Sequence, residues 1–400
     1  MMKKFKTNKG ITLVALVITI IVLLILAMVS ISIVMNQGII TKSKDAADKY
    51  NQKAEEEQGE LTFFERLLGQ YSGKDEASGD GDGATVETIT SEKINKVLSE
   101  TKNTKLKDEY GNKVVVPAGF KIKVDEDTNN ATHVTEGIVI QDKDNNEFVW
   151  IPVGNIKTSK EDTTGIQITL GRYSSFTVGT EPVQTIANYS EQVTINTYFT
   201  EDTSTNHNSS YGNAIANDIY AFLSSAESNG GYYLGRYEAR EKGNTATERT
   251  NSSSQTSDVV CNKENIVYNY ITQPNASKRC QGMYTEKPFT SDLINSYAWD
   301  TAIMFIENFS DNSSYASQKS VNTSTDGLAN KGTDADEISN IYDMASNCNE
   351  WSTETSSYSI GPCTGRGGYY IDSDIYTSDR YFRRTTVSIE SISFRPLLYM

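Results

Sequence analysis

The longest run of hydrophobic positions lies at the start of the chain, where Ile11 to Met35 contains no charged residue. A helix rises 1.5 Å per residue, so about 20 apolar residues cross the hydrocarbon core of a bilayer, and this run is long enough. Lysines at positions 3, 4, 6 and 9 precede it. Because positive charge stays on the cytoplasmic side, the pattern predicts a single transmembrane helix over 11–35 with the rest of the chain outside the cell.

After this helix the hydrophobic positions recur at helical spacing. Ala47, Tyr50 and Ala54 are followed by Leu61, Phe64 and Leu68, and intervals of three and four indicate one face of a stalk helix within 36–70. Residues 71–84, YSGKDEASGDGDGA, are rich in Gly and Asp and predict a flexible linker.

From residue 85 to 400 the pattern changes to short apolar runs between polar turns. NKVVVPAGFKIKV, EGIVIQDKDNNEFVWIPVG and GGYYLGRYEAR read as strands or hairpins, and QDKDNNE reads as a turn. One predicted helix carries Ile215, Ile219, Phe222 and Ala226 and stops at Asn229-Gly230-Gly231. A second carries Trp299, Ala302, Ile303 and Ile306 after Ser296 as its N-cap. With long polar loops at 245–257 and 310–326, the pattern predicts a loop-rich α+β domain.

Composition excludes several classes of function. The net charge of −15 makes nucleic acid an unfavourable partner. The two histidines, His133 and His207, lie in unrelated contexts, which argues against a histidine metal cluster and a Ser-His-Asp triad. Tyrosine is abundant, 23 residues against 13 phenylalanines, and its rigid ring with a hydroxyl suits recognition surfaces.

The N-terminal segment resembles a type IV prepilin leader and helix. The short basic leader, residues 1–10, ends in Gly10, and the resemblance implies processing between Gly10 and Ile11. Ala15 stands where that family usually has a glutamate that docks subunits into a filament. The resemblance therefore implies a bacterial cell-membrane protein displayed at the surface, with a minor pilin or pseudopilin of structural or adhesive role as the alternative.

Six motifs in residues 110–400 follow one another in a recognisable order. They are EFVWIPVG (147–154), GGYYLGRYEAR (230–240), INSYAWDTAIMFI (294–306), NIYDMASNCNEWSTE (340–354), GRGGYY (365–370) and SFRPLLYM (393–400). The series resembles the formylglycine-generating enzyme, or sulfatase-modifying factor, domain. That resemblance implies a C-type-lectin-like fold for the ectodomain.

The oxidase members of that family bind copper through two cysteines shortly after the Arg-Gly-Gly turn. Those places fall near Asp372 and Thr377, and residues 364–400 contain no cysteine. Because Cu(I) requires soft thiolate ligands, formylglycine-generating chemistry is not expected, and no catalytic residue is assigned. Asp372, Asp374 and Asp379 could serve as paired carboxylates for glycoside hydrolysis, but a polar rim is the more ordinary interpretation.

The segment 366–384, RGGYYIDSDIYTSDRYFRR, is similar instead to the varied region of proteins targeted by diversity-generating retroelements. Its aromatic and small polar residues suit a paratope-like surface. The predicted function is display of a non-catalytic binding domain for an extracellular protein or glycan. The predicted ligand-binding residues are Tyr369, Tyr370, Asp372, Ser373, Asp374, Ile375, Tyr376, Ser378, Asp379 and Tyr381.

The same resemblance implies a structural calcium ion, although no cofactor is required. Its ligands would be the side chains of Asp343 and Glu350 with the carbonyls of Ser346 and Cys348, and hard oxygen donors suit calcium. Independently, the four cysteines of an exported chain allow two disulfides in three connectivities. The sequential pairs Cys261–Cys280 and Cys348–Cys363 are preferred among them.

Overall fold

The computed structural model describes residues 86–173, 199–201, 218–329, 334–356, 361–372 and 374–400. All of them belong to one compact unit, Asp80–Met400. The predicted leader, membrane helix, stalk and linker lie outside the described residues. None of the helices in the described ranges is long and apolar enough to cross a membrane.

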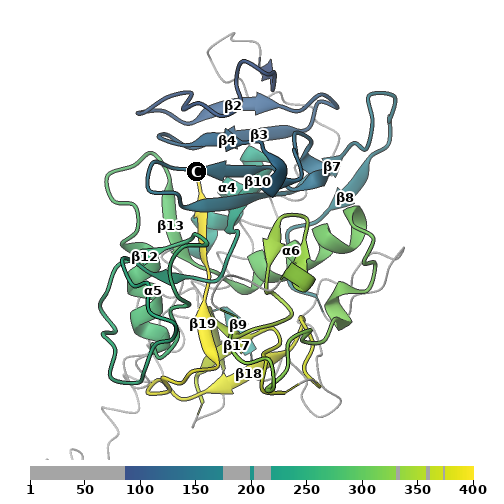
Figure 1. Cartoon of the computed structure of the whole chain (residues 1–400). Coiled ribbons are helices and arrows are strands. Elements are labelled where there is room, and N and C mark those ends of the chain that lie inside the picture. The colour runs from purple at the N-terminus through teal and green to yellow at the C-terminus, as the bar shows by residue number, and fades with distance from the viewer. Residues whose placement is uncertain (1–85, 174–198, 202–217, 330–333, 357–360, 373) are drawn as a thin grey trace, which may run out of the picture. The chain divides into compact units, whose positions relative to one another are not determined.

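The largest sheet has six strands, and every neighbouring pair in it is antiparallel. Across the sheet the order is β13 (Thr290–Leu293), β20 (Pro396–Tyr399), β10 (Gly231–Gly235), β6 (Glu147–Pro152), β5 (Val139–Gln141) and β4 (Lys121–Lys123). Three of the six family-like motifs thus lie side by side as β6, β10 and β20 (Figure 1).

Alternation along β6 explains why all of its residues are buried. Val149 and Ile151 belong to the core that includes the helices, whereas Phe148 and Trp150 belong to the core on the other face. Side chains alternate between the two faces of a strand. The continuous apolar run FVWI therefore fills two cores at once.

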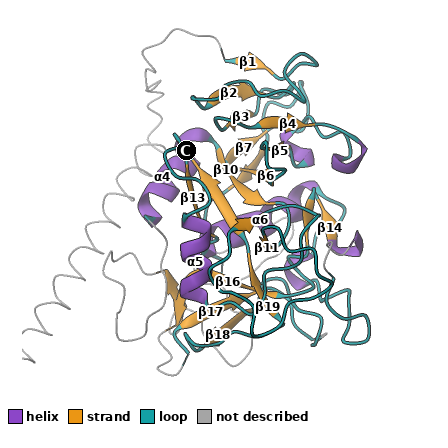
Figure 2. Ribbon diagram, turned by 60° about the vertical axis from the view of Figure 1, so that its left-hand side comes forward, coloured by secondary structure: helices purple, strands orange, loops and turns teal. Residues whose placement is uncertain are grey.

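A second sheet holds the C-terminal motifs (Figures 1 and 2). Its path is β18 (Arg380–Arg383), β17 (Cys363–Arg366), β16 (Asn349–Ser356) and β19 (Ile392–Phe394), and β9 (Phe199–Glu201) also pairs with β16. Pairing of β16 with β19 is parallel, and the other pairings are antiparallel.

Smaller sheets and 3-10 turns complete the scaffold. The small sheets are β1 (Glu87–Thr88), β2 (Thr104–Lys107) and β3 (Lys113–Val116), then β7 (Gly154–Ile156) with β8 (Ile166–Ile168), β11 (Arg240–Glu241) with β12 (Val259–Val260), and β14 (Glu337–Ile338) with β15 (Ile341–Tyr342). The 3-10 turns are η1 (Glu126–Thr128), η2 (Val134–Glu136), η3 (Tyr315–Ser317) and η4 (Asp334–Asp336).

Three α-helices are present in the described residues, one more than predicted. The helix α4 (Ile219–Asn229) ends at Gly230, whose φ of 78° is the left-handed conformation that glycine adopts readily. The other two are α5 (Gln273–Gln281) and α6 (Ser296–Phe309). Helix α5, QPNASKRCQ, is too polar to show an apolar stripe in the sequence, and it packs along β13 (Figure 2).

The predicted start of α6 is wrong by one residue. Asn295 is the N-cap, because its Oδ1 accepts the backbone N–H of Ala298 at 2.8 Å, and Ser296 is already helical. Asn and Ser are both good N-caps, so the sequence alone does not separate them. The predicted α4 stripe began at Ile215, which lies outside the described residues, and the described helix follows Asp218 as its N-cap.

The strand and loop predictions hold in outline. β3 to β6 and β10 fall in the predicted runs, and QDKDNNE is a turn in which Asp142 Oδ1 accepts the backbone N–H groups of Asp144 and Asn146. Residues 245–257 contain no helix or strand. The domain is therefore α+β, rich in sheet and loop with few helices, as predicted.

Candidate functional site

The predicted ligand-binding residues lie in the connection between β17 and β18, except Tyr381, which lies on β18 itself. Asp372 and Asp374 are exposed, and Ile371, which was not predicted, is 46% exposed. A further five side chains are half-buried, and these are Tyr369, Tyr370, Tyr376, Ser378 and Tyr381. Ser373 lies outside the described residues. We call residues 369–381 the tyrosine segment.

Two of the predicted residues are not available to a ligand. Ile375 and Asp379 are each only 5% exposed. Asp379 Oδ2 accepts hydrogen bonds from the backbone N–H of Tyr376 at 3.0 Å and from the hydroxyl of Tyr381 at 3.2 Å. The backbone carbonyl oxygen of Asp379 accepts a hydrogen bond from Arg366 Nε. The prediction that these two residues contact a ligand is therefore wrong. Their side chains point into the protein and support the segment, because alternate residues of the loop between 375 and 379 are buried.

The Arg-Gly-Gly turn, residues 366–368, directly precedes this segment, and its glycines are required by close packing. Gly367 has a φ of 77°, and an added Cβ would lie 2.4 Å from the carbonyl oxygen of Met344. At Gly368 the same atom would lie 2.0 Å from the carbonyl oxygen of Ala345. Asn349 Nδ2 donates to the carbonyl oxygens of both glycines. The Asn-Glu-Trp motif on β16 thereby holds the turn.

Arg366 does not reach the surface but enters a buried ion network. Its Nη2 lies 2.5 Å from Asp300 Oδ1 on α6, and Arg380 Nη2 lies 2.7 Å from Asp300 Oδ2. Arg380 Nε also contacts both Glu354 oxygens, at 2.9 and 3.0 Å, and Arg172 pairs with Glu354. Three cations and two anions therefore join α6, β16, β17 and β18 beneath the tyrosine segment.

The network keeps its acids ionised in spite of burial. Burial by itself would raise the pKa of Asp300, but Arg380 and Arg366 hold it below its ordinary value. The same opposition of burial and guanidinium charge lowers the pKa of Glu354. Breaking such a buried pair leaves an uncompensated charge, which costs more than the intact pair contributes. The network thus specifies how the hairpin sits on α6.

A neighbouring loop supports the outer part of the segment. Thr377 N donates to Gln318 O at 3.0 Å, and Ser378 N donates to Ala316 O at 3.1 Å. On the exposed side, Lys319 Nζ lies 2.9 Å from Asp374 Oδ1 and 5.4 Å from the centre of the Tyr376 ring. Lys319 was not predicted as part of the site, because it is distant in sequence.

On another side the segment meets Glu390 and Tyr270. The Tyr270 hydroxyl lies 3.2 Å from Glu390 Oε2. Burial and then the charge of Glu390 raise the pKa of Tyr370 to about 12, with a hydrogen bond to the same carboxylate adding to the shift. One carboxylate therefore lies between two tyrosine hydroxyls, only one of them from the predicted segment.

One of the predicted calcium ligands, Glu350, is engaged in an ion pair. Glu350 is buried, and Arg395 contacts both of its oxygens, at 3.0 Å from Nε and 2.5 Å from Nη2. Within the described ranges, no group of three or more His, Cys, Asp or Glu side chains is placed to hold a metal ion. Glu350 therefore fits an ion pair better than calcium. The calcium site stays a prediction, which the change in melting temperature on adding EGTA would test.

All four cysteines are free and buried, so the predicted disulfides are not present in the structure. Three of the thiols are directed at oxygen acceptors: Cys261 at Tyr237 O, Cys348 at Glu390 O and Cys363 at the Gln273 side chain. Burial raises the pKa of Cys261 to about 11 and that of Cys363 to about 12. These residues act as small core side chains.

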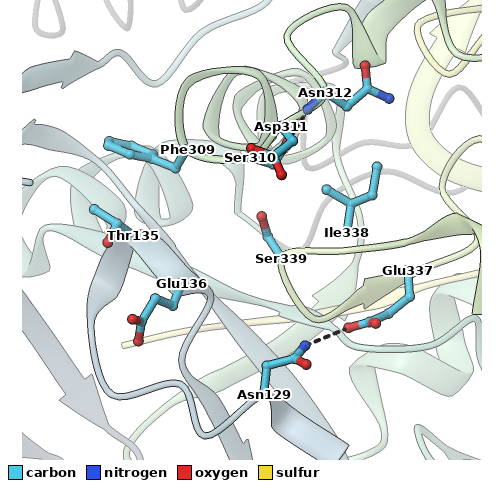
Figure 3. A pocket seen from close by; sticks show the side chains of 10 residues that line it. All are labelled: Asn129, Thr135, Glu136, Phe309, Ser310, Asp311, Asn312, Glu337, Ile338 and Ser339. Carbon is cyan, nitrogen blue, oxygen red and sulfur yellow. Dashed lines mark hydrogen bonds between the residues drawn. The ribbon is translucent and has the colours of Figure 1, made fainter.

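A separate cavity of about 590 Å³ lies at the end of α6 (Figure 3). Its lining is polar, and Asn129 donates to Glu337 across it at 3.5 Å. It is lined by Asn129, Thr135, Glu136, Phe309, Ser310, Asp311, Asn312, Glu337, Ile338 and Ser339. None of the predicted site residues lines this cavity.

Comparison with known proteins finds one weak structural similarity. No protein-family model and no curated protein matches the chain. One solved structure, Treponema denticola variable protein 1, aligns with 42% of this chain and 85% of its own, at 13% identity and a TM-score of 0.29. So loose an alignment supports no argument about function, and the proposals below rest on the contacts within this chain.

Proposed function

We propose that the tyrosine segment is the ligand-binding surface of a non-catalytic, C-type-lectin-like domain. The observation that carries the proposal is that the hairpin formed by β17, β18 and their connection has exposed side chains on its outer side and a buried ion network beneath them. Ile371, Asp372 and Asp374 are exposed and the tyrosines are half-buried, while Arg366 and Arg380 are fully buried in ion pairs. Aromatic anchors beside small polar residues on a fixed base are typical of paratopes.

The interlocking of the family-like motifs supports the lectin-like assignment. Arg395 of the last motif pairs with Glu350 of the Asn-Glu-Trp motif and donates to Gly235 O of β10. Asn347, in the same motif as Glu350, donates to Glu238, which lies in the GGYYLGRYEAR motif just after β10. Motifs that are separate in sequence thus form one buried polar assembly, as expected if they belong to one ancestral domain.

The placement of the acids favours binding over hydrolysis. Asp379 has its Oδ2 turned to Tyr376 and Tyr381 inside the loop, and Asp374 pairs with Lys319. A pair of hydrolytic carboxylates must instead face each other across a scissile bond. We therefore propose recognition as the function of this surface.

We also propose that the segment is the target of a diversity-generating retroelement. Sequencing the 3′ end of the gene from a clonal population tests this. Substitutions should occur at outward positions such as Tyr370, Asp372, Asp374 and Tyr376. Arg366, Gly367, Gly368, Ile375 and Arg380 should remain unchanged. A uniform sequence, with no adenine-differing repeat beside a reverse transcriptase gene, would contradict variation but not binding.

Surface display from a membrane helix over 11–35 is the proposed setting of this domain. Protease treatment of intact cells should then release the domain while the N-terminal segment stays in the membrane fraction. The alternative, a minor pilin, predicts recovery of the protein in filaments sheared from the cells. Recovery in sheared filaments would replace the display proposal.

A further inference from the structure

The exposed part of the tyrosine segment is too small to make an ordinary protein interface by itself. The described residues with exposed or half-buried side chains are Tyr369, Tyr370, Ile371, Asp372, Asp374, Tyr376, Ser378 and Tyr381. A stable interface uses roughly 20–30 residues and about 800 Å² on each side. If this surface binds a protein, its neighbours must contribute.

Residues from three other parts of the chain lie at the segment and remain accessible. Lys319 is 45% exposed at its side chain while it contacts Asp374 and the Tyr376 ring. Tyr270 is half-buried and is held by Glu390, and the adjacent Ile389 is 42% exposed. Ile371 and Ile389 are two of only five large hydrophobic side chains exposed in the described residues.

The backbone fixes Tyr270 in place. Its φ is 48°, an uncommon conformation for a non-glycine residue, and its N–H donates to Ile389 O at 3.0 Å. The neighbouring Asn269 side chain donates to Glu390 O at 2.8 Å. An aromatic ring held in this way loses little conformational entropy on binding, which is the property of an interface anchor.

Charges of both signs lie at this surface. Asp374 pairs with Lys319, Glu390 contacts Tyr270, and the Arg383 guanidinium lies 5.2 Å from the centre of the Tyr381 ring. The whole chain carries −15. A surface of mixed charge with aromatic rings and exposed isoleucines gains affinity from burying apolar area, and not from attracting a charged polymer.

We infer that the binding surface is composite: Tyr270, Lys319, Ile389 and Glu390 are anchors outside the tyrosine segment, and the partner is a folded protein. This inference rests on the proposed function of the segment. It assigns the changeable contacts to the β17–β18 connection and the constant contacts to three neighbouring loops. A new specificity could then arise without rebuilding the whole interface.

A display library tests the inference without knowledge of the natural ligand. Tyr370, Ile371, Asp372, Asp374 and Tyr376 are randomised in the full chain, and binders are selected on lysozyme as a folded-protein probe and on dextran as a polysaccharide probe. Lysozyme binders are then remade with Tyr270→Ala or Lys319→Ala. Matched controls are Tyr110→Ala, whose ring stacks on His133, and Lys242→Ala, and neither side chain contacts the described residues of the segment.

Each test substitution should weaken lysozyme binding by about tenfold or more in most clones, whereas the controls change it by less than about twofold. The measured Kd should also change little with salt. Lysozyme binders that tolerate both test substitutions would overturn the composite surface and leave the proposed function intact. Binders on dextran alone would overturn the protein partner. A library without binders on either probe would overturn the proposed function and this inference together.

Discussion

Arg366 of the Arg-Gly-Gly turn lies 2.5 Å from Asp300 of α6, and both side chains are fully buried. The arginine at the end of β17, just before the tyrosine segment, is therefore a structural residue. It ties a connection with exposed side chains to the most buried helix of the domain. This relationship separates the part of the hairpin that must stay constant from the part that is open to change.

Asp300→Asn should destabilise the protein by about 3–5 kcal/mol, because Arg366 and Arg380 would lose their shared anion while Glu354 alone faced three guanidinium groups. Denaturant unfolding measures the loss. Asp311→Asn, an exposed aspartate just beyond the same helix, is the control and should change stability by less than about 0.5 kcal/mol. Equal effects would refute the structural role of the pair.

Gly367→Ala and Gly243→Ala separate two costs that a glycine substitution can carry. The φ angles are nearly equal, 77° and 76°, but only at Gly367 would the new Cβ meet other atoms, the nearest being Met344 O at 2.4 Å. Gly243→Ala should cost about 1–2 kcal/mol from the backbone alone. Gly367→Ala should cost about 1–3 kcal/mol more. Comparable melting temperatures for the two variants would show that the turn relaxes freely.

Asp379 should make stability depend on pH. Burial raises its pKa to about 6, above the ordinary 3.8. The folded protein therefore holds this proton more tightly, so its contribution is complete below pH about 4 and is lost as the pH rises through about 6. Asp379→Asn removes that loss. The stability of the variant relative to wild type should rise by about 2–3 kcal/mol from pH 4 to pH 8. A difference that stays constant with pH would contradict the burial of this carboxyl.

The two isoleucines of the tyrosine segment offer an internal comparison. Ile371 is 46% exposed and Ile375 is 5% exposed. Ile375→Ala should lower the free energy of unfolding by about 2–4 kcal/mol, since it leaves a cavity. Ile371→Ala should lower it by less than about 0.5 kcal/mol. A larger loss of stability for Ile371→Ala than for Ile375→Ala would contradict the assignment of Ile371 as exposed and Ile375 as buried.

The thiols provide a test of the cysteine arrangement. Because all four are buried and burial raises their pKa values, an Ellman-type reagent at pH 8 should react only slowly with the folded protein. In denaturant without a reductant, four thiols should react per chain. If two or none react, the protein contains disulfides that this structure lacks.

The sequence indicated a candidate binding segment, and its binding role stays a prediction. The Tyr, Asp and Ser residues after Arg366 belong to β18 and to its connection with β17, and the strand runs around them were found by their periodicity. Ile375 and Asp379 were included wrongly because composition does not distinguish inward from outward residues in a loop. One signal was available in the sequence: Asp300 stands in the apolar run YAWDTAIMFI, and a charge at such a position requires a buried partner.

Tyr270, Lys319 and Glu390 had no such signal. Each is unremarkable in its own stretch and meets the tyrosine segment only because the intervening chain folds between them. Local pattern determined most of the elements and the glycine turn, since these depend on neighbours a few residues away. Only the tertiary structure decided which side chains share a surface and which share a buried charge network. Those pairings depend on packing between elements that lie far apart along the chain.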